Sequence, residues 1–337
     1  MARRAGIPCV TAAVLALALS AAGCAGAQGK GRPTTFNSPV AFRVYAVSDQ
    51  QRQLVGTTPS AQPLTIPPCR WWLVEPQDPV DMEKVRQEVQ AKGIPGLKLS
   101  DATDADLEHV SGLTGLHSLD LGGTEVTDAG LEHLKDLKEL QEINLILTEV
   151  TDAGLQHLSG LTALQRLYLG HTSVTGGGLQ HLSGLTALQE LDLSATKLTD
   201  AGLEHLKGLT GLRALYLGGT EVTDVGLGYL EALTGLQVLY LSHTRTTGAG
   251  LEHMKGLAAL RELYLNGTQV SDAGLEHLKG LTGLRVLYLN GTQVSDAGLE
   301  HLRGLRGLQE LNLSATQVTD AGVAALREPL PEVEIIR

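Results

Sequence analysis

The sequence is poor in aromatic residues, in cysteine and in clustered basic residues, and each shortage excludes a class of protein. Phe, Trp and Tyr make up 3% of the 337 residues, and both Trp and both Phe lie in the first quarter of the chain. The formal charge is -11 without any run of Lys and Arg, which argues against a surface for nucleic acid or for an anionic membrane. The three cysteines, Cys9, Cys24 and Cys69, provide no disulfide framework.

The first residues have the layout of an export signal. Arg3 and Arg4 precede an apolar run at residues 10–22, which is too short to span a bilayer. Residues 19–24, LSAAGC, resemble a bacterial lipobox, in which the cysteine becomes the lipidated first residue of the mature protein. We therefore expect a signal peptide at 1–23 and a lipid anchor at Cys24. The AGA at 25–27 offers the alternative of cleavage to a secreted or periplasmic protein.

A short composite region separates the signal from the rest of the chain. Residues 24–37 are predicted to be a tether. Residues 38–78 alternate in polarity and are punctuated by Gly and Pro, which predicts a small β module. The motif LVGTTP at 54–59, followed by LTI at 64–66, resembles PEGA-type β modules of bacterial envelope proteins, and an unrelated β cap is the alternative. Residues 79–93 predict a capping helix that starts after Asp81 and stops at Gly93.

One unit of 24 residues repeats through most of the chain. The segment LYLNGTQVSDAGLEHL at 263–278 returns unchanged at 287–302. A threonine recurs at the same interval, at Thr124, Thr148, Thr172, Thr196, Thr220, Thr244, Thr268, Thr292 and Thr316. Such a period is typical of a solenoid, in which coils stack instead of enclosing one core.

The template LxxLxLxxTxVTDAGLEHLxG resembles the leucine-rich repeat, most closely that of bacterial envelope proteins. The resemblance implies an α/β horseshoe at residues 94–337, with about nine to ten coils, a parallel concave sheet and short convex helices. Within each coil, the alternation in LYL suits one short strand. Ser271 and its equivalents can cap the helix, with a following Asp at the positive helix end.

Two features of the template carry further local predictions. The threonine row stands where leucine-rich repeats usually carry asparagine, and its hydroxyls are expected to bond backbone groups of the next coil. The coils containing TGGG at 175–178 and TGAG at 247–250 lack the Asp and gain glycine, so we expect their convex helices to be the loosest.

Functional candidates lie on the solvent-facing positions of the concave strands. Five of the seven tyrosines fall in one row, at Tyr168, Tyr216, Tyr240, Tyr264 and Tyr288. The neighbouring exposed row contributes Arg166, Glu190 and Glu262. Because strands lie about 4.8 Å apart, the last four tyrosines predict a stripe roughly 14 Å long. Either this row is a binding surface, since tyrosine is common at interface hot spots, or it only stabilises the strands by stacking.

The remaining repeated polar residues do not indicate catalysis or metal binding. Eight histidines recur on the convex side, but each is at least 24 residues from the next and has no local partner ligand. No Ser or Cys nucleophile stands beside a base. We therefore expect no enzyme activity, no cofactor and no metal site.

The sequence as a whole predicts an envelope-associated scaffold that binds a protein or peptide through the tyrosine row. It would touch the membrane only through the lipid at Cys24. Two alternatives remain: a structural spacer in the envelope, and a glycan-binding module in which tyrosine faces stack on sugars.

Overall fold

The computed structural model describes residues 34–48, 51–78 and 80–337. The predicted signal peptide, Cys24 and most of the predicted tether lie outside these residues. Among the described helices, none combines the length and the apolar character that crossing a membrane requires.

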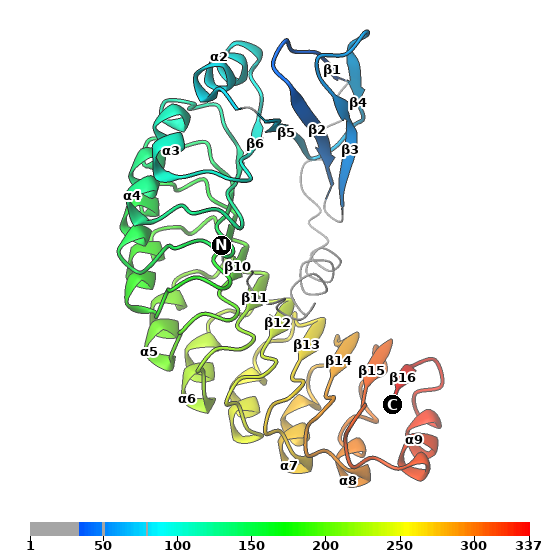
Figure 1. Cartoon of the computed structure of the whole chain (residues 1–337). Coiled ribbons are helices and arrows are strands. Elements are labelled where there is room, and N and C mark those ends of the chain that lie inside the picture. Colours follow the sequence, from blue (N-terminus) through cyan, green and yellow to red (C-terminus); the bar gives the residue numbers. More distant parts are fainter. Residues whose placement is uncertain (1–33, 49–50, 79) are drawn as a thin grey trace, which may run out of the picture.

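The repeats form a curved stack of coils, with a strand on the inner side and a short helical segment on the outer side of each coil (Figure 1). Consecutive strands pair in parallel at 24-residue intervals, as Leu239 with Leu263 and Leu263 with Leu287 show. This architecture confirms the predicted leucine-rich-repeat solenoid. Its strands are β6 (Gly96–Lys98), β7 (Ser118–Asp120), β8 (Glu142–Asn144), β9 (Arg166–Tyr168), β10 (Glu190–Asp192), β11 (Ala214–Tyr216), β12 (Val238–Tyr240), β13 (Glu262–Tyr264), β14 (Val286–Tyr288), β15 (Glu310–Asn312) and β16 (Glu334–Ile336).

A continuous apolar core lies between the strands and the helical segments. Within one coil, Leu263, Leu265, Val270, Leu275 and Leu278 have no exposed surface. Their equivalents in the other coils belong to the same cluster, which extends from the first strands to the last coil. Full burial of such a side chain stabilises the fold by about 1.5–3 kcal/mol. Because each coil shares this core with two neighbours, the stack is stable where a single coil is not.

Seven of the ten described convex segments begin as α-helix, and four of these continue as 3-10 helix. The side chains of Thr127 and Ser295 accept the backbone N–H two residues on, as expected for caps. The α-helices are α3 (Asp104–Val110), α4 (Asp128–Leu131), α5 (Asp200–Leu203), α6 (Asp224–Leu227), α7 (Asp272–Leu275), α8 (Asp296–Leu299) and α9 (Asp320–Arg327). The 3-10 helices are η1 (Glu132–Leu134), η2 (Gly154–Leu158), η3 (Gly177–Leu182), η4 (Glu204–Leu206), η5 (Gly228–Leu230), η6 (Ala249–Met254) and η7 (Glu276–Leu278).

The threonine row acts within each coil, so the prediction that it bonds the next coil is wrong. The hydroxyl of Thr268 donates to the carbonyl oxygen of Leu265, three residues earlier, at 2.6 Å. The turn after each strand brings this carbonyl to the hydroxyl, whose single proton is then used locally. Bonds to the next coil come from the backbone instead, for example from the N–H of Gly267 to the carbonyl of Asn290 at 2.9 Å.

An aspartate ladder that the sequence analysis did not predict joins the coils on the convex side. Asp128 accepts both the backbone N–H and the hydroxyl of Thr151 in the next coil, at 2.8 and 2.6 Å. The same pair of bonds is made by Asp104, Asp152, Asp200, Asp224, Asp272 and Asp296. Each carboxylate therefore fixes the residue that starts the following helical segment.

The ladder is interrupted at the two glycine-bearing coils, where Gly176 and Gly248 replace the aspartate. A Cβ atom on either glycine would lie 2.8 Å from the Cα of Gly202 or Gly274 in the next coil. Glycine is therefore required for this close approach. In both coils a 3-10 helix forms without an α-helical turn, as it also does in the coil of η2, which keeps Asp152.

The strands before the repeats extend the sheet of the solenoid. They are β1 (Thr34–Phe36), β2 (Phe42–Val47), β3 (Arg52–Thr57), β4 (Leu64–Ile66) and β5 (Trp71–Pro76). β5 pairs in parallel with β6, β2 pairs with β5, and β3 pairs with β2, so one 14-stranded sheet runs from β3 to β16. β1, which begins inside the range predicted as a tether, pairs with β4 in a separate two-stranded sheet.

Helix α2 (Met82–Lys92) precedes the first coil, and its ends are those that the sequence predicts. The side chain of Asp81 accepts the backbone N–H of Lys84 at 3.2 Å, and Gly93 ends the helix with a φ of 57°. Its stripe of Met82, Val85 and Val89 is buried in the core cluster. The helix thus covers apolar surface at the N-terminal end of the convex row (Figure 1).

Candidate functional site

The predicted tyrosine row is a straight line of side chains across the concave strands. Parallel pairing places Asp192 beside Tyr168 and Tyr216, and Tyr240 beside Tyr216 and Tyr264. Tyr288 continues the line on β14. The sheet therefore brings all five predicted tyrosines into one column, interrupted once by Asp192.

Four of these tyrosines contact one another in sequence. The ring centroids are 6.1 Å apart for Tyr216 and Tyr240, 4.2 Å for Tyr240 and Tyr264, and 5.0 Å for Tyr264 and Tyr288. The middle pair is stacked and the last pair meets edge to face, which are favourable arrangements for aromatic rings. Ala214, Val238 and Val286 in the neighbouring row complete an apolar cluster separate from the leucine core. We call this cluster, Ala214, Tyr216, Val238, Tyr240, Tyr264, Val286 and Tyr288, the aromatic platform.

The exposure of the platform is uneven. Tyr240 and Tyr288 are partly exposed, whereas Tyr216 and Tyr264 expose only 2% and 3% of their surface. The expectation that every ring in the row faces solvent is therefore wrong for these two residues. Tyr264 is covered on both sides by the rings of its neighbours.

Carboxylates of the adjacent row hold two of the phenols. The hydroxyl of Tyr264 donates to the carboxylate of Glu262 at 2.9 Å, and that of Tyr288 donates to Glu310. Burial raises the pKa of Tyr264, and the nearby Glu262 carboxylate raises it further. Glu262, a binding residue predicted from the sequence, therefore orients a tyrosine of the platform.

Arg166 lies at the boundary between the concave face and the strands that precede the repeats. Its Nε donates to Glu142 at 2.8 Å, and its guanidinium lies over the ring of Trp71 at 4.7 Å. Arg70 lies over the same ring at 4.5 Å and also donates to Gln165 at 3.2 Å. Arg166 thus helps to fix β5 against the concave face.

An ion pair fixes β3, the edge strand of the sheet, against the same face. Arg52 on β3 donates to the carboxylate of Asp120 on β7 at 2.8 Å. The strands β3 and β5 therefore contact the concave side of β7 to β9. Sequence reasoning missed these contacts because the partners are 68 and 95 residues apart. The aromatic platform on β11 to β14 lies beyond them.

Two acids on β10 lie between these regions. Glu190 and Asp192 expose 9% and 8% of their surface. Burial raises the pKa of Glu190 to about 7, Arg166 and Tyr168 oppose the rise, and Glu142 and Asp192 add to it. Burial also raises the pKa of Asp192, although the backbone N–H of Ser194 donates to its carboxylate at 2.8 Å.

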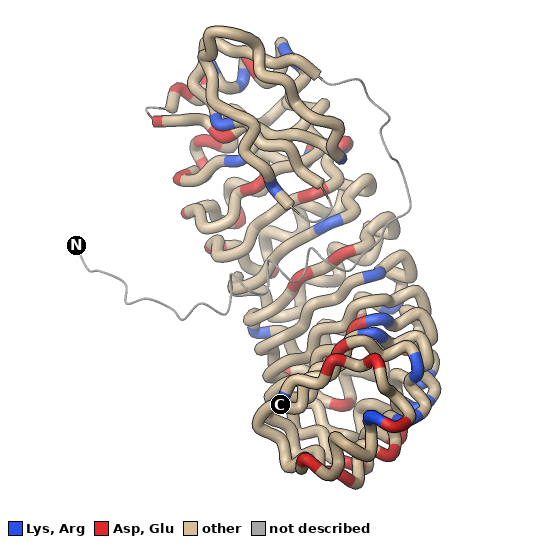
Figure 2. The backbone as a smooth tube through the Cα atoms, turned by 90° about the vertical axis from the view of Figure 1, so that its right-hand side faces the viewer, with Lys and Arg blue, Asp and Glu red and all other residues tan. Residues whose placement is uncertain are grey.

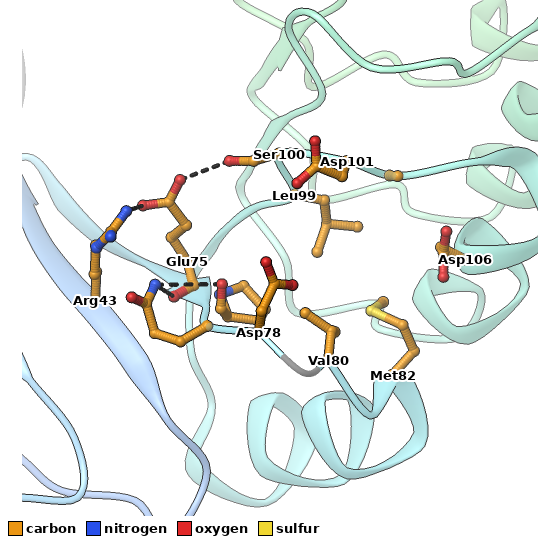
Figure 3. A pocket seen from close by; sticks show the side chains of 12 residues that line it. Arg43, Glu75, Asp78, Val80, Met82, Leu99, Ser100, Asp101 and Asp106 are labelled. Carbon is orange, nitrogen blue, oxygen red and sulfur yellow. Dashed lines mark hydrogen bonds and ion pairs between the residues drawn. The ribbon is translucent and has the colours of Figure 1, made fainter. Parts of the chain in front are cut away.

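A separate polar cluster joins the first coil to β5 beside a cavity of about 270 Å³ (Figure 3). Glu75 accepts hydrogen bonds from Lys98 at 2.8 Å, Ser100 at 2.6 Å and Tyr45 at 2.8 Å. Burial alone would raise the pKa of Glu75, but these bonds lower it to about 2. Since every donor belongs to the strands or to the first coil, this cluster holds the two parts together.

Charged residues of both signs are interspersed along the coils (Figure 2). On the convex side, the ring of His253 lies 2.6 Å from Glu231. Across the described ranges, no group of three His, Cys, Asp or Glu residues has the geometry to hold a metal ion.

Comparisons with known proteins show what the repeats are similar to. Models described as leucine rich repeat match residues 211–270 and 260–318, and 113–135 and 184–207. The crystal structure of an internalin, inlF, from Listeria monocytogenes is similar with a TM-score of 0.61 and 22% identity, over 76% of each chain. Internalin C2, inlC2, from the same organism gives a TM-score of 0.47 and 28% identity, over 69% of this chain and 84% of that one. The comparison with curated sequences gave no match.

Proposed function

We propose that the chain is a non-catalytic scaffold that binds a protein or a peptide on its concave face. The observation that carries this proposal is the aromatic platform, whose side chains pack with each other outside the leucine core that builds the solenoid. The proposed binding residues are Tyr168, Tyr216, Tyr240, Tyr264, Tyr288, Arg166, Glu190 and Glu262.

The platform has the properties of a binding surface for a polypeptide. Tyrosine offers a large contact area at small entropic cost and is enriched at interface hot spots. Hydrogen bonds to Glu262 and Glu310 hold Tyr264 and Tyr288 in place before a ligand arrives, which reduces the ordering cost of binding. Leucine-rich-repeat solenoids provide extended concave surfaces that suit such ligands.

The test is capture of a ligand by the full chain and by two variants. Tyr240→Ala combined with Tyr264→Ala removes the stacked pair and should weaken capture at least about tenfold, as expected for a hot spot. Tyr229→Ala is the matched control, because Tyr229 lies on the convex side under Lys207, with 4.4 Å between the Lys207 amine and the ring. Capture by the double variant at the level of the control would contradict the proposal.

Two binding assays with the same protein decide the class of ligand. A glycan array and a polypeptide pull-down, both read with the Tyr240 and Tyr264 double variant, separate a sugar ligand from a polypeptide. Binding on the array alone would show that the platform stacks on sugars. No binding on either support would favour a structural spacer.

The proposed location is the bacterial envelope, through a lipid on Cys24. The support is the LSAAGC motif, since residues 1–33 are outside the described structure. Replacing Cys24 by Ser should move the protein from the membrane fraction to the soluble fraction. An unchanged distribution would remove the lipid anchor from the proposal and leave export of an unanchored protein.

A further inference from the structure

A pair of acidic residues adjoins the aromatic platform, and its neighbours are on the two flanking strands. Parallel pairing places Asp192 on β10 between Tyr168 on β9 and Tyr216 on β11. Glu190 is on the same strand as Asp192, two residues earlier, so both side chains are on the concave side. Asp192 therefore has a tyrosine on either side, and Glu190 beside it lies between Arg166 and Ala214.

The carboxylates of this pair outnumber the cations beside them. Among the described residues, neither Glu190 nor Asp192 forms an ion pair. Arg166 lies opposite Glu190 on β9, and its charge lowers the pKa of that carboxyl, but its Nε is bonded to Glu142 and its guanidinium lies over Trp71. Both acids are more than nine-tenths buried, and a buried carboxylate without a paired cation is unfavourable.

The tyrosines on either side add a second attraction for positive charge. The face of an aromatic ring attracts an ammonium or guanidinium group, and this attraction grows as the cation loses water. Two carboxylates on a strand whose neighbours each carry a tyrosine therefore favour the binding of a Lys or Arg side chain over that of a neutral side chain. An aliphatic stem on such a side chain can continue onto Tyr216 and the rest of the platform.

We propose that the polypeptide bound on the concave face places a Lys or Arg side chain between Tyr168 and Tyr216, against Glu190 and Asp192, and apolar side chains on the aromatic platform. This inference rests on the proposed function and specifies the chemistry of its ligand. From β10 to β12 or β13 is about 10–14 Å, because neighbouring strands lie about 4.8 Å apart. An extended peptide covers that distance in about three or four residues, which sets the spacing between its basic and apolar residues.

The experiment is a selection of displayed random peptides on the full chain. Three proteins are used in parallel: the wild type, Glu190→Gln with Asp192→Asn, and Tyr240→Ala with Tyr264→Ala. The expected wild-type peptides carry Lys or Arg about three or four positions from an apolar residue. A synthetic peptide of this kind should bind the neutralised variant about tenfold more weakly or worse. Replacing its basic residue by Gln should cause the same loss on the wild type and little further loss on that variant.

The outcomes separate this inference from the proposed function. Some peptides could lose binding in the Tyr240 and Tyr264 double variant and yet carry no basic residue, or bind the neutralised variant as well as the wild type. Such peptides would contradict the binding of a basic residue at Glu190 and Asp192 and leave the proposed function intact. The absence of any peptide that depends on the tyrosine pair would contradict both. Glu252→Gln with Glu276→Gln, on the convex side, is the charge-matched control, and circular dichroism of each variant confirms that the solenoid is folded.

The pH dependence of binding supplies an independent readout. Glu190 faces Arg166 and Tyr168 on β9, Glu142 on β8, Tyr216 on β11 and Asp192 on its own strand. Its pKa of about 7 means that it loses its proton between pH 6 and pH 8. A lysine peptide should therefore bind several-fold more tightly at pH 8 than at pH 6. The increase should disappear in Glu190→Gln, and an equal increase in that variant would contradict the role of this carboxylate.

Discussion

At the scale of single residues, the backbone conformation shows which positions of the repeat are strained when they are not glycine. The third residue after each of the strands β7 to β15 adopts a left-handed conformation, with φ of 70° at Gly219 and 53° at Ala195. Glycine adopts this conformation freely, whereas residues with a Cβ atom are disfavoured by about 1–2 kcal/mol. Leu147 is unusual in two respects, because a large apolar residue here has a φ of 60° and is 49% exposed.

The same substitution should therefore have opposite effects at two nearby exposed alanines. Ala195→Gly relieves the left-handed strain and should stabilise the protein by about 0.5–1 kcal/mol. Ala201→Gly, in helix α5, adds unfolded-state freedom at a helical position and should destabilise it by about 0.5–1 kcal/mol. Urea unfolding followed by circular dichroism measures both. Destabilisation by both variants would show that Ala195 is not strained.

The Asp128 carboxylate tests the ladder between coils. Asp128→Ala leaves the N–H and hydroxyl of Thr151 without their acceptor and should lower the free energy of unfolding by about 1–3 kcal/mol. Asp136→Ala is the control, because Asp136 is exposed and accepts no side-chain hydrogen bond among the described residues. Equal unfolding free energies for the two variants would show that the ladder does not stabilise the stack.

At the scale of elements, β5 is the strand that joins the two parts of the molecule. It pairs with β2 on one side and β6 on the other, and it carries both Trp71, which contacts Arg166, and Glu75, which contacts Lys98. Pairing alone would allow the first strands to swing about β6. The side-chain contacts at both ends of β5 fix their position against the concave face.

Glu75 makes this junction sensitive to acid. Its pKa falls to about 2 in the folded protein from an ordinary 4.5, so the carboxylate stabilises the fold above about pH 4.5 and this contribution is lost as pH falls toward 2. Glu75→Gln should lower the free energy of unfolding by about 2–3 kcal/mol at pH 7. The difference from wild type should shrink between pH 5 and pH 2.

The measurement is urea unfolding at several pH values. Glu108→Gln is the matched control, because Glu108 is exposed and its side chain forms no hydrogen bond or ion pair within the described residues. A deficit in Glu75→Gln that stays constant down to pH 2 would show that the carboxylate charge does not account for the stability of the junction.

At the scale of the whole molecule, the period of the sequence predicts most of the fold. A leucine pattern repeated every 24 residues leaves one way to bury all copies, which is to stack them. The tyrosine column follows from the same period, because parallel pairing in register carries equal positions into one line. Contacts that do not follow the period were not predictable, and they include Arg52 with Asp120 and Trp71 with Arg166.

Because of these unpredicted contacts, the concave face has three regions along its length. The strands β3 and β5 contact its N-terminal part, the acids of β10 come next, and the aromatic platform follows on β11 to β14 (Figure 1). Along the concave face, the side chains therefore change from charged to aromatic. A ligand that is basic at one end and apolar at the other fits this order.

Site-specific photo-cross-linking tests the location of binding most directly. Benzoylphenylalanine is incorporated in place of Tyr240 on the concave face or in place of Tyr229 on the convex side, and each protein is irradiated with a peptide selected on the wild-type chain. A covalent adduct from position 240 and none from position 229 is the result that binding on the aromatic platform predicts. Adduct formation from position 229 alone, or equally from both, would contradict it.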